Sequence, residues 1–193
     1  MLSDWIKFLF DKGASIVILA CNTASAYAIR EWQNTYPDKK VLSVTIPWVE
    51  AMLWKWYKNV WILATNATVK SNIYINKFHE IKEFEDLNIK QVWCPSLVEI
   101  VENKIIDENY INSEISNYLS SIWSNNLDTL VLGCTHFPIL KSYIEKQFSG
   151  DIIDPSNEAV LALQSYFNRH KEIYDKISKN WKLEIYTSWE NKF

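Results

Sequence analysis

Short apolar runs alternate along the chain with stretches in which apolar residues recur every three or four positions. The apolar runs predict strands at residues 15–20, 40–46, 59–65, 88–93, 128–133, 151–154 and near 183–188. The stretches between them predict helices at 2–11, 23–33, 48–56, 70–85, 96–122 (one or two helices), after Pro138 and at 157–171. Continuously apolar strands alternating with helices predict an α/β fold, with mostly parallel sheets covered by helices on both faces.

Two of the predicted strands end in the same way. ACNTASA follows the first strand at residues 20–26, and LGCTHFPIL follows a later one at residues 132–140. Each strand stops at a small residue and a cysteine, Cys21 or Cys134. Ligands of parallel α/β sheets bind beyond the carboxyl ends of the strands, so position alone directs both thiols toward a site. The alternative is a pair of buried structural cysteines, a common type of core residue.

Each thiol also precedes a predicted helix start, where unpaired backbone N–H groups favour a thiolate. Short polar side chains able to bind a carboxylate or cap a helix follow the two thiols: Asn22, Thr23, Thr135 and His136. Two thiols on opposite sides of a small ligand suit one reaction in particular. One thiolate removes a proton from carbon, and the other thiol returns a proton to the opposite face.

The charge and composition of the chain argue against several kinds of binding partner. The net charge is −3 and no apolar run reaches the length of a membrane span, so we expect neither nucleic acid nor a membrane as partner. The first residues predict an amphipathic helix closed by Gly13 and not a signal peptide. Three cysteines without C-x-x-C spacing argue against disulfides and structural zinc, and favour a cytoplasmic location. With no metal, flavin or pyridoxal motif, we expect no cofactor and no metal.

The tryptophan and glycine counts are unusual. The chain has ten Trp and three Gly, and the two counts together come to the ordinary glycine share of about 7%. Trp48 follows a proline, Trp123 ends a predicted helix, and Trp189 lies in a predicted loop, all places that favour glycine. We therefore hypothesise that most or all of these Trp represent UGA codons that the source organism reads as glycine. A tryptophan-rich interior is the alternative.

The two cysteine motifs together resemble those of glutamate racemase, in the aspartate/glutamate racemase superfamily. The likeness extends over nearly the whole chain, through the segments IPWVEA (46–51), KNVWILATNATVKSNIY (58–74), CPSLVEIVE (94–102) and IYTSWENKF (185–193). It implies two pseudo-symmetric lobes. The first would hold residues 1–46 and 143–193, without its opening strands, and the second residues 47–142.

The resemblance implies cofactor-independent racemisation of glutamate, which supplies D-glutamate for peptidoglycan. Cys21 and Cys134 would be the acid/base residues, and His136 would assist Cys134. Substrate would be held by Asn22, Thr23, Thr135, Thr65 and Thr68. Glu102 would either support this group or be a solvated helix carboxylate, while Cys94 is expected to be structural and His79 to face solvent. Family members pair in different ways, so a homodimer stays open.

The chain also departs from the family. The family opens with a strand ending in Asp-Ser-Gly and a later Pro-Tyr-Gly segment, and neither occurs here. The absent aspartate is the usual partner of the first cysteine. We therefore expect the 193 residues to be a fragment that is inactive as written.

Other functions stay open at this point. The nearest is another racemase or isomerase of the superfamily, acting on aspartate, hydantoins or maleate. A non-catalytic dicarboxylate-binding remnant comes from a different class. A thiol hydrolase built on Cys134 and His136 lacks a recognisable orienting acid, and a metal site lacks a fourth ligand.

Overall fold

The computed structural model describes residues 2–187, apart from 53–54, 56, 82–86, 123–126 and 180–181. Its strands are β1 (Ile16–Leu19), β2 (Lys40–Ser43), β3 (Asn59–Ala64), β4 (Asn88–Trp93), β5 (Thr129–Leu132) and β6 (Asp151–Ile153). Its helices are α1 (Leu2–Asp11), α2 (Asn22–Thr35), α3 (Thr45–Ala51), α4 (Asn66–Ser71), α5 (Ile73–His79), α6 (Pro95–Glu102), α7 (Glu108–Ile122), η3 (Phe137–Leu140), α8 (Lys141–Glu145), α9 (Pro155–Arg169) and α10 (Lys171–Tyr174). Within these ranges no helix combines the length and apolarity needed to cross a bilayer.

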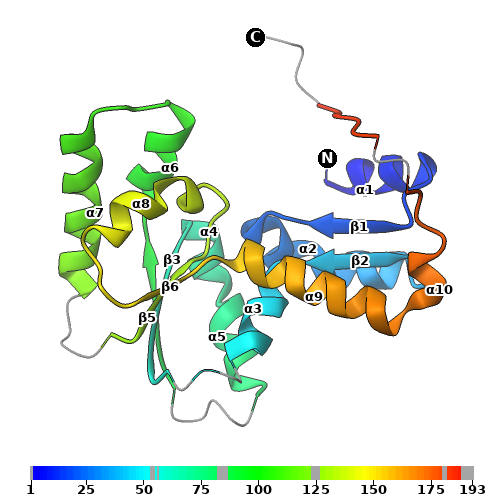
Figure 1. Cartoon of the computed structure of the whole chain (residues 1–193), viewed down its shortest axis with the longest axis horizontal. Helices are drawn as coiled ribbons and strands as arrows, with labels where there is room; N and C mark the ends of the chain where they lie inside the picture. The colour runs from blue at the N-terminus through cyan, green and yellow to red at the C-terminus, as the bar shows by residue number, and fades with distance from the viewer. Residues whose placement is uncertain are drawn as a thin grey trace.

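The larger sheet is parallel and has the strand order β4-β3-β5-β6. Successive side chains of its central strand β3 point to opposite faces, as the two-residue strand period requires. Trp61 and Leu63 pack with α6 and α7, whereas Val60, Ile62 and Ala64 pack with α3 and α5. Helices therefore cover both faces (Figure 1), and the predicted α/β class is confirmed.

The smaller sheet consists of β1 and β2, which pair in parallel from Ile16 with Lys40 to Leu19 with Ser43. One face carries a core made by these strands with α1 and α2, including Val17 and Leu19. Gly13 closes α1 as predicted, in a left-handed conformation (φ +93°) that glycine adopts without strain. Figure 1 shows α9 running past β2.

The two sheets define two lobes that lie side by side (Figure 1). We expected the chain to leave the second lobe at residue 142. The structure places this crossing later, because β6 pairs with β5, Thr129 opposite Asp151 and Val131 opposite Ile153. The chain returns to the first lobe at Asp154. This residue caps α9 by accepting a hydrogen bond from the Ser156 N–H at 2.9 Å.

Three predicted elements differ from the observed ones. The helix expected at 70–85 is two helices, α4 and α5, because Asn72 adopts a left-handed conformation (φ 52°) between them. The strand expected at 40–46 stops at Ser43, whose hydroxyl accepts the Thr45 N–H as α3 begins. No strand forms in the described part of 183–188, up to Thr187.

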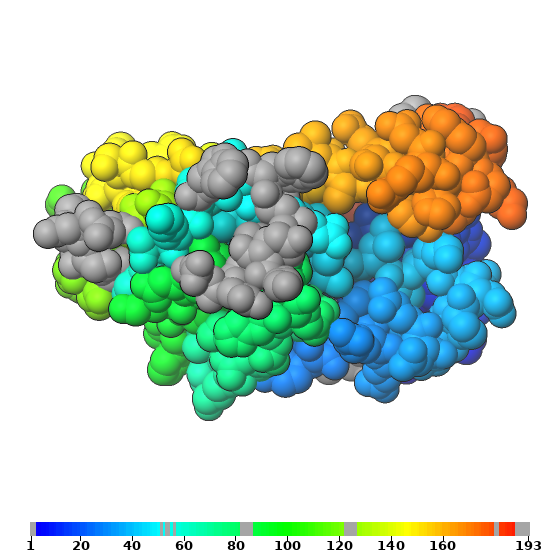
Figure 2. All heavy atoms as spheres, turned by 90° about the horizontal axis from the view of Figure 1, so that it is seen from below, coloured from blue at the N-terminus to red at the C-terminus, as the bar shows by residue number. Residues whose placement is uncertain are grey.

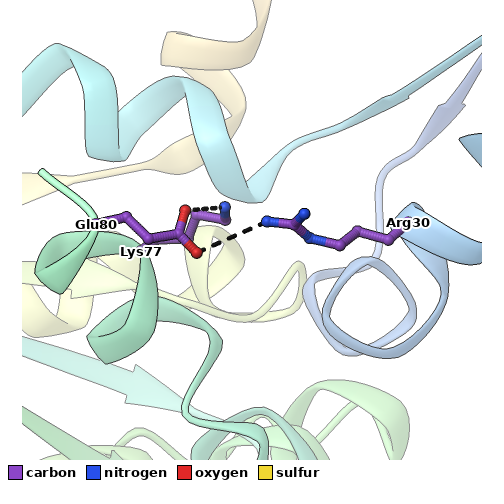
Figure 3. A network of polar contacts seen from close by, with 3 residues as sticks. All are labelled: Arg30, Lys77 and Glu80. Carbon is purple, nitrogen blue, oxygen red and sulfur yellow. Dashed lines mark hydrogen bonds and ion pairs between the residues drawn. The ribbon is translucent and has the colours of Figure 1, made fainter.

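Direct contacts also join the lobes through α2. The Tyr27 hydroxyl donates to the Ala67 carbonyl at 3.1 Å. Figure 3 shows Arg30 of α2 reaching toward Glu80, which lies just after α5 and also pairs with Lys77. The Arg30–Glu80 separation is 3.7 Å and both side chains are largely exposed, so this ion pair contributes little to stability.

Candidate active site

Cys21 lies at the carboxyl end of β1 and caps α2. Its sulfur accepts the Ala24 N–H at 3.5 Å, so the thiol faces the positive end of a helix as predicted. The side chain is exposed to solvent. Within the described residues, this N–H is the one hydrogen-bond partner that the Cys21 sulfur has.

Cys134 follows β5 and is only 6% exposed. Gly133 brings it there through close contact with β3, since its N–H donates to the Leu63 carbonyl at 2.8 Å and a Cβ would meet that oxygen. Burial raises the pKa of the Cys134 thiol, the His136 N–H lowers it, and the charges of Cys21 and Glu102 raise it.

His136 links Cys134 to a carboxylate. Its Nδ1 lies 3.5 Å from the Cys134 sulfur, and its Nε2 lies 2.5 Å from Glu102 Oε1 at the end of α6. When the proton is on Nε2 and is donated to the Glu102 carboxylate, Nδ1 is free to accept the thiol proton. Glu102 combines both features expected of it: its side chain is 63% exposed, and it contacts His136. It also supplies the orienting acid that the sequence did not reveal.

Asn22 and Tyr74 form a buried polar pair between the lobes. Asn22 is 4% exposed and accepts a hydrogen bond from the Tyr74 hydroxyl of α5. Burial, together with the charges of both active thiols, raises the pKa of Tyr74, so the phenol keeps its proton and donates it. Tyr74 was not among the predicted site residues, although it ends the Ser-x-x-Tyr motif at residues 71–74.

Three threonine hydroxyls meet where the N-terminus of α2 faces that of α4. Thr23 Oγ1 lies 2.8 Å from Thr65 Oγ1 and 3.0 Å from Thr68 Oγ1, and the latter two are 3.1 Å apart. Thr65 also caps α4 by accepting the Thr68 N–H. The structure thus brings the predicted site residue Thr23 together with two others, Thr65 and Thr68, which lie 42 and 45 residues further along the chain.

A cavity of about 200 Å³ lies between the carboxyl ends of the two sheets. Asn22 and Val44 line it from the first lobe, and Cys134 and Thr135 from the second. Asp154 also lines the cavity. Asp154 was not among the predicted site residues, because the Pro that follows it indicates a helix cap and not a binding site.

The remaining chemistry-bearing residues lie elsewhere or fulfil other roles. Cys94 is fully buried, and burial raises the pKa of its thiol to about 12, in keeping with a structural role. His79 is exposed, as expected. The described residues contain no group of three His, Cys, Asp or Glu side chains able to hold a metal ion.

The sequence model of the Asp/Glu/Hydantoin racemase family matches residues 1–163. Among similar proteins, the glutamate racemase of Persephonella marina is 38% identical over 161 residues, which make up 82% of this chain and 60% of that protein. The glutamate racemase of Aquifex aeolicus is 34% identical over 162 residues, or 83% and 61% of the two chains. The chain thus spans about three fifths of the length of these relatives.

Solved structures of glutamate racemases are also similar to this chain. Glutamate racemase isoform RacE1 from Bacillus anthracis superposes with a TM-score of 0.81 at 29% identity, over 89% of this chain and 64% of that one. The glutamate racemase of Francisella tularensis, solved in complex with D-glutamate, gives a TM-score of 0.79 at 30% identity, over 90% and 64%.

Proposed function

Because this chain belongs to the Asp/Glu/Hydantoin racemase family, we propose that its site interconverts L- and D-glutamate without a cofactor. The observation that carries the proposal is the cavity between the strand ends of the two lobes, which Cys134 lines from one lobe and Asn22, the neighbour of Cys21, lines from the other. The D-glutamate would serve peptidoglycan synthesis in the cytoplasm.

The proposed chemistry is a proton transfer on each face of the α-carbon. One sulfur, as thiolate, takes the α-proton as the C–H bond breaks, and the opposite thiol gives its proton to the carbanion. The raised pKa of Cys134 suits the proton donor. In the reverse direction His136 Nδ1 takes the Cys134 proton, and Glu102 stabilises the imidazolium that results.

Substrate binding is assigned to the polar groups around the thiols. Asn22, Thr23 and Thr135 stand beside the two sulfurs in sequence, and Thr65 with Thr68 extend the hydroxyl cluster from the second lobe. These groups donate hydrogen bonds to carboxylate oxygens and accept them from an ammonium group. Tyr74 positions Asn22 through their buried hydrogen bond.

We further propose that the 193 residues as printed do not turn glutamate over. Cys21 is exposed, whereas thiol acid/base chemistry on carbon is effective in a site that excludes water. Its sulfur also has no side-chain partner among the described residues, in contrast to the Cys134–His136–Glu102 array.

The experiment measures exchange of the glutamate α-proton in deuterated water and the circular dichroism of glutamate. The chain is assayed alone and mixed with the part of the P. marina protein that it does not match. We expect exchange into both enantiomers from the mixture only, its loss in Cys134→Ala, and its retention in Cys94→Ala. Turnover of aspartate alone would show a different racemase, and binding without exchange would show a non-catalytic protein.

A thiol hydrolase is the second candidate, because Glu102 completes a Cys–His–carboxylate array. That function leaves Cys21 without a role. Hydrolysis of small thioesters that persists in Cys21→Ala would favour it over racemisation.

A further inference from the structure

Among the described residues that line the cavity beside Cys134, Asp154 alone carries a charge. The others are apolar or have neutral polar side chains, as Asn22 and Thr135 do. An amino acid brings an ammonium group into such a cavity, and removing that group from water is unfavourable unless an anion pairs with it. Asp154 is the lining residue that can provide this anion.

The Asp154 carboxylate is held in place by its neighbour Ser156. Its Oδ1 accepts both the Ser156 N–H at 2.9 Å and the Ser156 hydroxyl at 2.8 Å. Ser156 also lines the cavity, and Asp154 is partly buried. A carboxylate accepts hydrogen bonds through both oxygens. Because neither bond from Ser156 uses Oδ2, this oxygen remains available to a cation.

The fold brings Asp154 to the ends of two neighbouring strands. β6 pairs in parallel with β5, with Ile153 opposite Val131, so Asp154 leaves β6 beside the segment that leads from β5 to Cys134. Asp154 also caps α9 (orange in Figure 2), which begins where the two lobes meet. Sheets of this kind bind ligands at the carboxyl ends of their strands. Asp154 therefore lies at an edge of the sheet where a ligand is expected.

Asn22 lines the same cavity with the opposite polarity. It is 4% exposed, and its side-chain oxygen accepts a hydrogen bond from the Tyr74 hydroxyl. Because the oxygen is engaged in this bond, the amide NH2 group is left as a donor to a ligand. A donor suits a carboxylate and Asp154 suits an ammonium group. The two residues thus match the two charged groups that every α-amino acid carries on its α-carbon.

We propose that Asp154 binds the ammonium group of the substrate, and that its charge makes the site select amino acids over dicarboxylates without an amino group. The assignment rests on the proposed function, since it concerns the same cavity. The Asp154 carboxylate attracts an ammonium group and repels a ligand whose only charges are carboxylates. It also favours the protonated form of the amine.

Asp154 also borders a second cavity, of about 260 Å³, together with Asp151 and Glu158. No cysteine of the described chain lines that cavity, and Lys55 supplies it with a cation of the protein itself. An ammonium ligand there would compete with Lys55 and would meet no thiol. The proposal therefore concerns the cavity beside Cys134.

The test compares L-glutamate with glutarate, the same dicarboxylate without the amino group. The affinity of the full 193-residue chain for each compound is measured by isothermal titration calorimetry. Asp154→Asn and Asp154→Ser remove the charge but keep a residue type that caps helices well, so α9 should form in both variants. Asp107→Asn is the matched control, because Asp107 likewise accepts the Asn109 N–H at 2.9 Å ahead of α7 and does not line the cavity.

We expect the wild-type chain to bind L-glutamate at least about tenfold more tightly than glutarate. Both Asp154 variants should lose this preference, through weaker binding of L-glutamate and unchanged or tighter binding of glutarate, while Asp107→Asn keeps it. Equal affinities of the wild-type chain for the two compounds, including no detectable binding of either, would overturn the proposal. So would an equal loss of affinity for both compounds in the Asp154 variants, which would show a structural role.

Calorimetry measures affinity and not racemisation, so the two proposals fail separately. If the preference for L-glutamate depends on Asp154 but the α-proton does not exchange, the racemase proposal fails and this one stands. If exchange occurs but the affinities are equal, this proposal alone fails.

Discussion

At the scale of single residues, His136 contacts both the Cys134 thiol and the Glu102 carboxylate. The thiol is buried, and its pKa is raised by that burial and by the charges of Cys21 and Glu102. The imidazole is held between sulfur and carboxylate, so its free nitrogen faces the thiol. Such an arrangement keeps the proton on sulfur at neutral pH while providing a base that can take it.

We predict that alkylation of Cys134 by iodoacetamide sets in above the usual thiol range of pH about 8–9, because its pKa is raised. Glu102→Gln removes a charge that raises this pKa, so the pH midpoint of alkylation should shift down. Mass spectrometry of the alkylated peptide against pH measures both. Glu99→Gln, an exposed carboxylate of the same helix, is the control, and an upward shift in Glu102→Gln would contradict the prediction.

The tryptophans raise a separate question at this scale. Trp48 lies in α3 and is fully buried, whereas Trp123 and Trp189 are outside the described residues. Trp32 and Trp61 each bury an indole N–H that has no hydrogen-bond partner among the described residues, whereas the Trp48 ring packs against the Tyr74 ring. A buried donor without a partner costs about 1–3 kcal/mol, and such donors are few in folded proteins.

The glycine hypothesis predicts the mass of the protein made in its own cells. Intact-mass measurement should fall below the mass of the printed sequence by whole multiples of the Trp–Gly difference. A mass equal to that of the printed sequence would exclude recoding and leave the tryptophan-rich interior.

At the scale of elements, strand ends position the site. Residues at or just after the ends of β1, β2, β5 and β6 line one cavity, because the carboxyl ends of the parallel strands in both sheets face it. β1 and β3 are each followed by a helix whose first turn is capped by an adjacent residue, Cys21 on α2 and Thr65 on α4. These caps depend only on neighbouring residues in the sequence.

Gly133 is the most tightly constrained of these positions. A Cβ there would lie 2.8 Å from both the Leu63 carbonyl oxygen and the Ile62 side chain. We expect Gly133→Ala to push β5 away from β3 and lower the free energy of unfolding by about 1–3 kcal/mol. Urea denaturation measures the change, and an unaltered midpoint would show that the strands can move apart without cost.

At the scale of the whole molecule, two kinds of contact join the lobes. The hydroxyl cluster of Thr23, Thr65 and Thr68 is partly buried, whereas the ion pair of Arg30 and Glu80 lies in solvent. Partly buried hydrogen bonds are worth more than exposed ion pairs, because water and salt screen the latter.

We therefore predict that Thr23→Val lowers the free energy of unfolding by about 1 kcal/mol, and that Glu80→Gln changes it by no more than about 0.5 kcal/mol. Urea titrations at low and high salt measure both variants. A larger effect of Glu80→Gln, or a strong salt dependence of wild-type stability, would reverse this ranking.

The sequence by itself determined the α/β class, most strands and helices, the closure of α1 at Gly13, and both cysteine motifs. These depend on apolar periodicity and on residues next to one another, so the information is local. Even the exposure of His79 follows from the charged residues around it.

Only the tertiary structure decided how distant residues meet. The Glu102–His136 contact, the Tyr74–Asn22 pair and the later lobe crossing at Asp154 each join segments far apart in the chain. The expected strand near 183–188 fails for the same reason. A strand forms only beside another strand, because its backbone N–H and C=O groups need partners. The alternating pattern of this segment does not determine whether such a partner strand lies next to it.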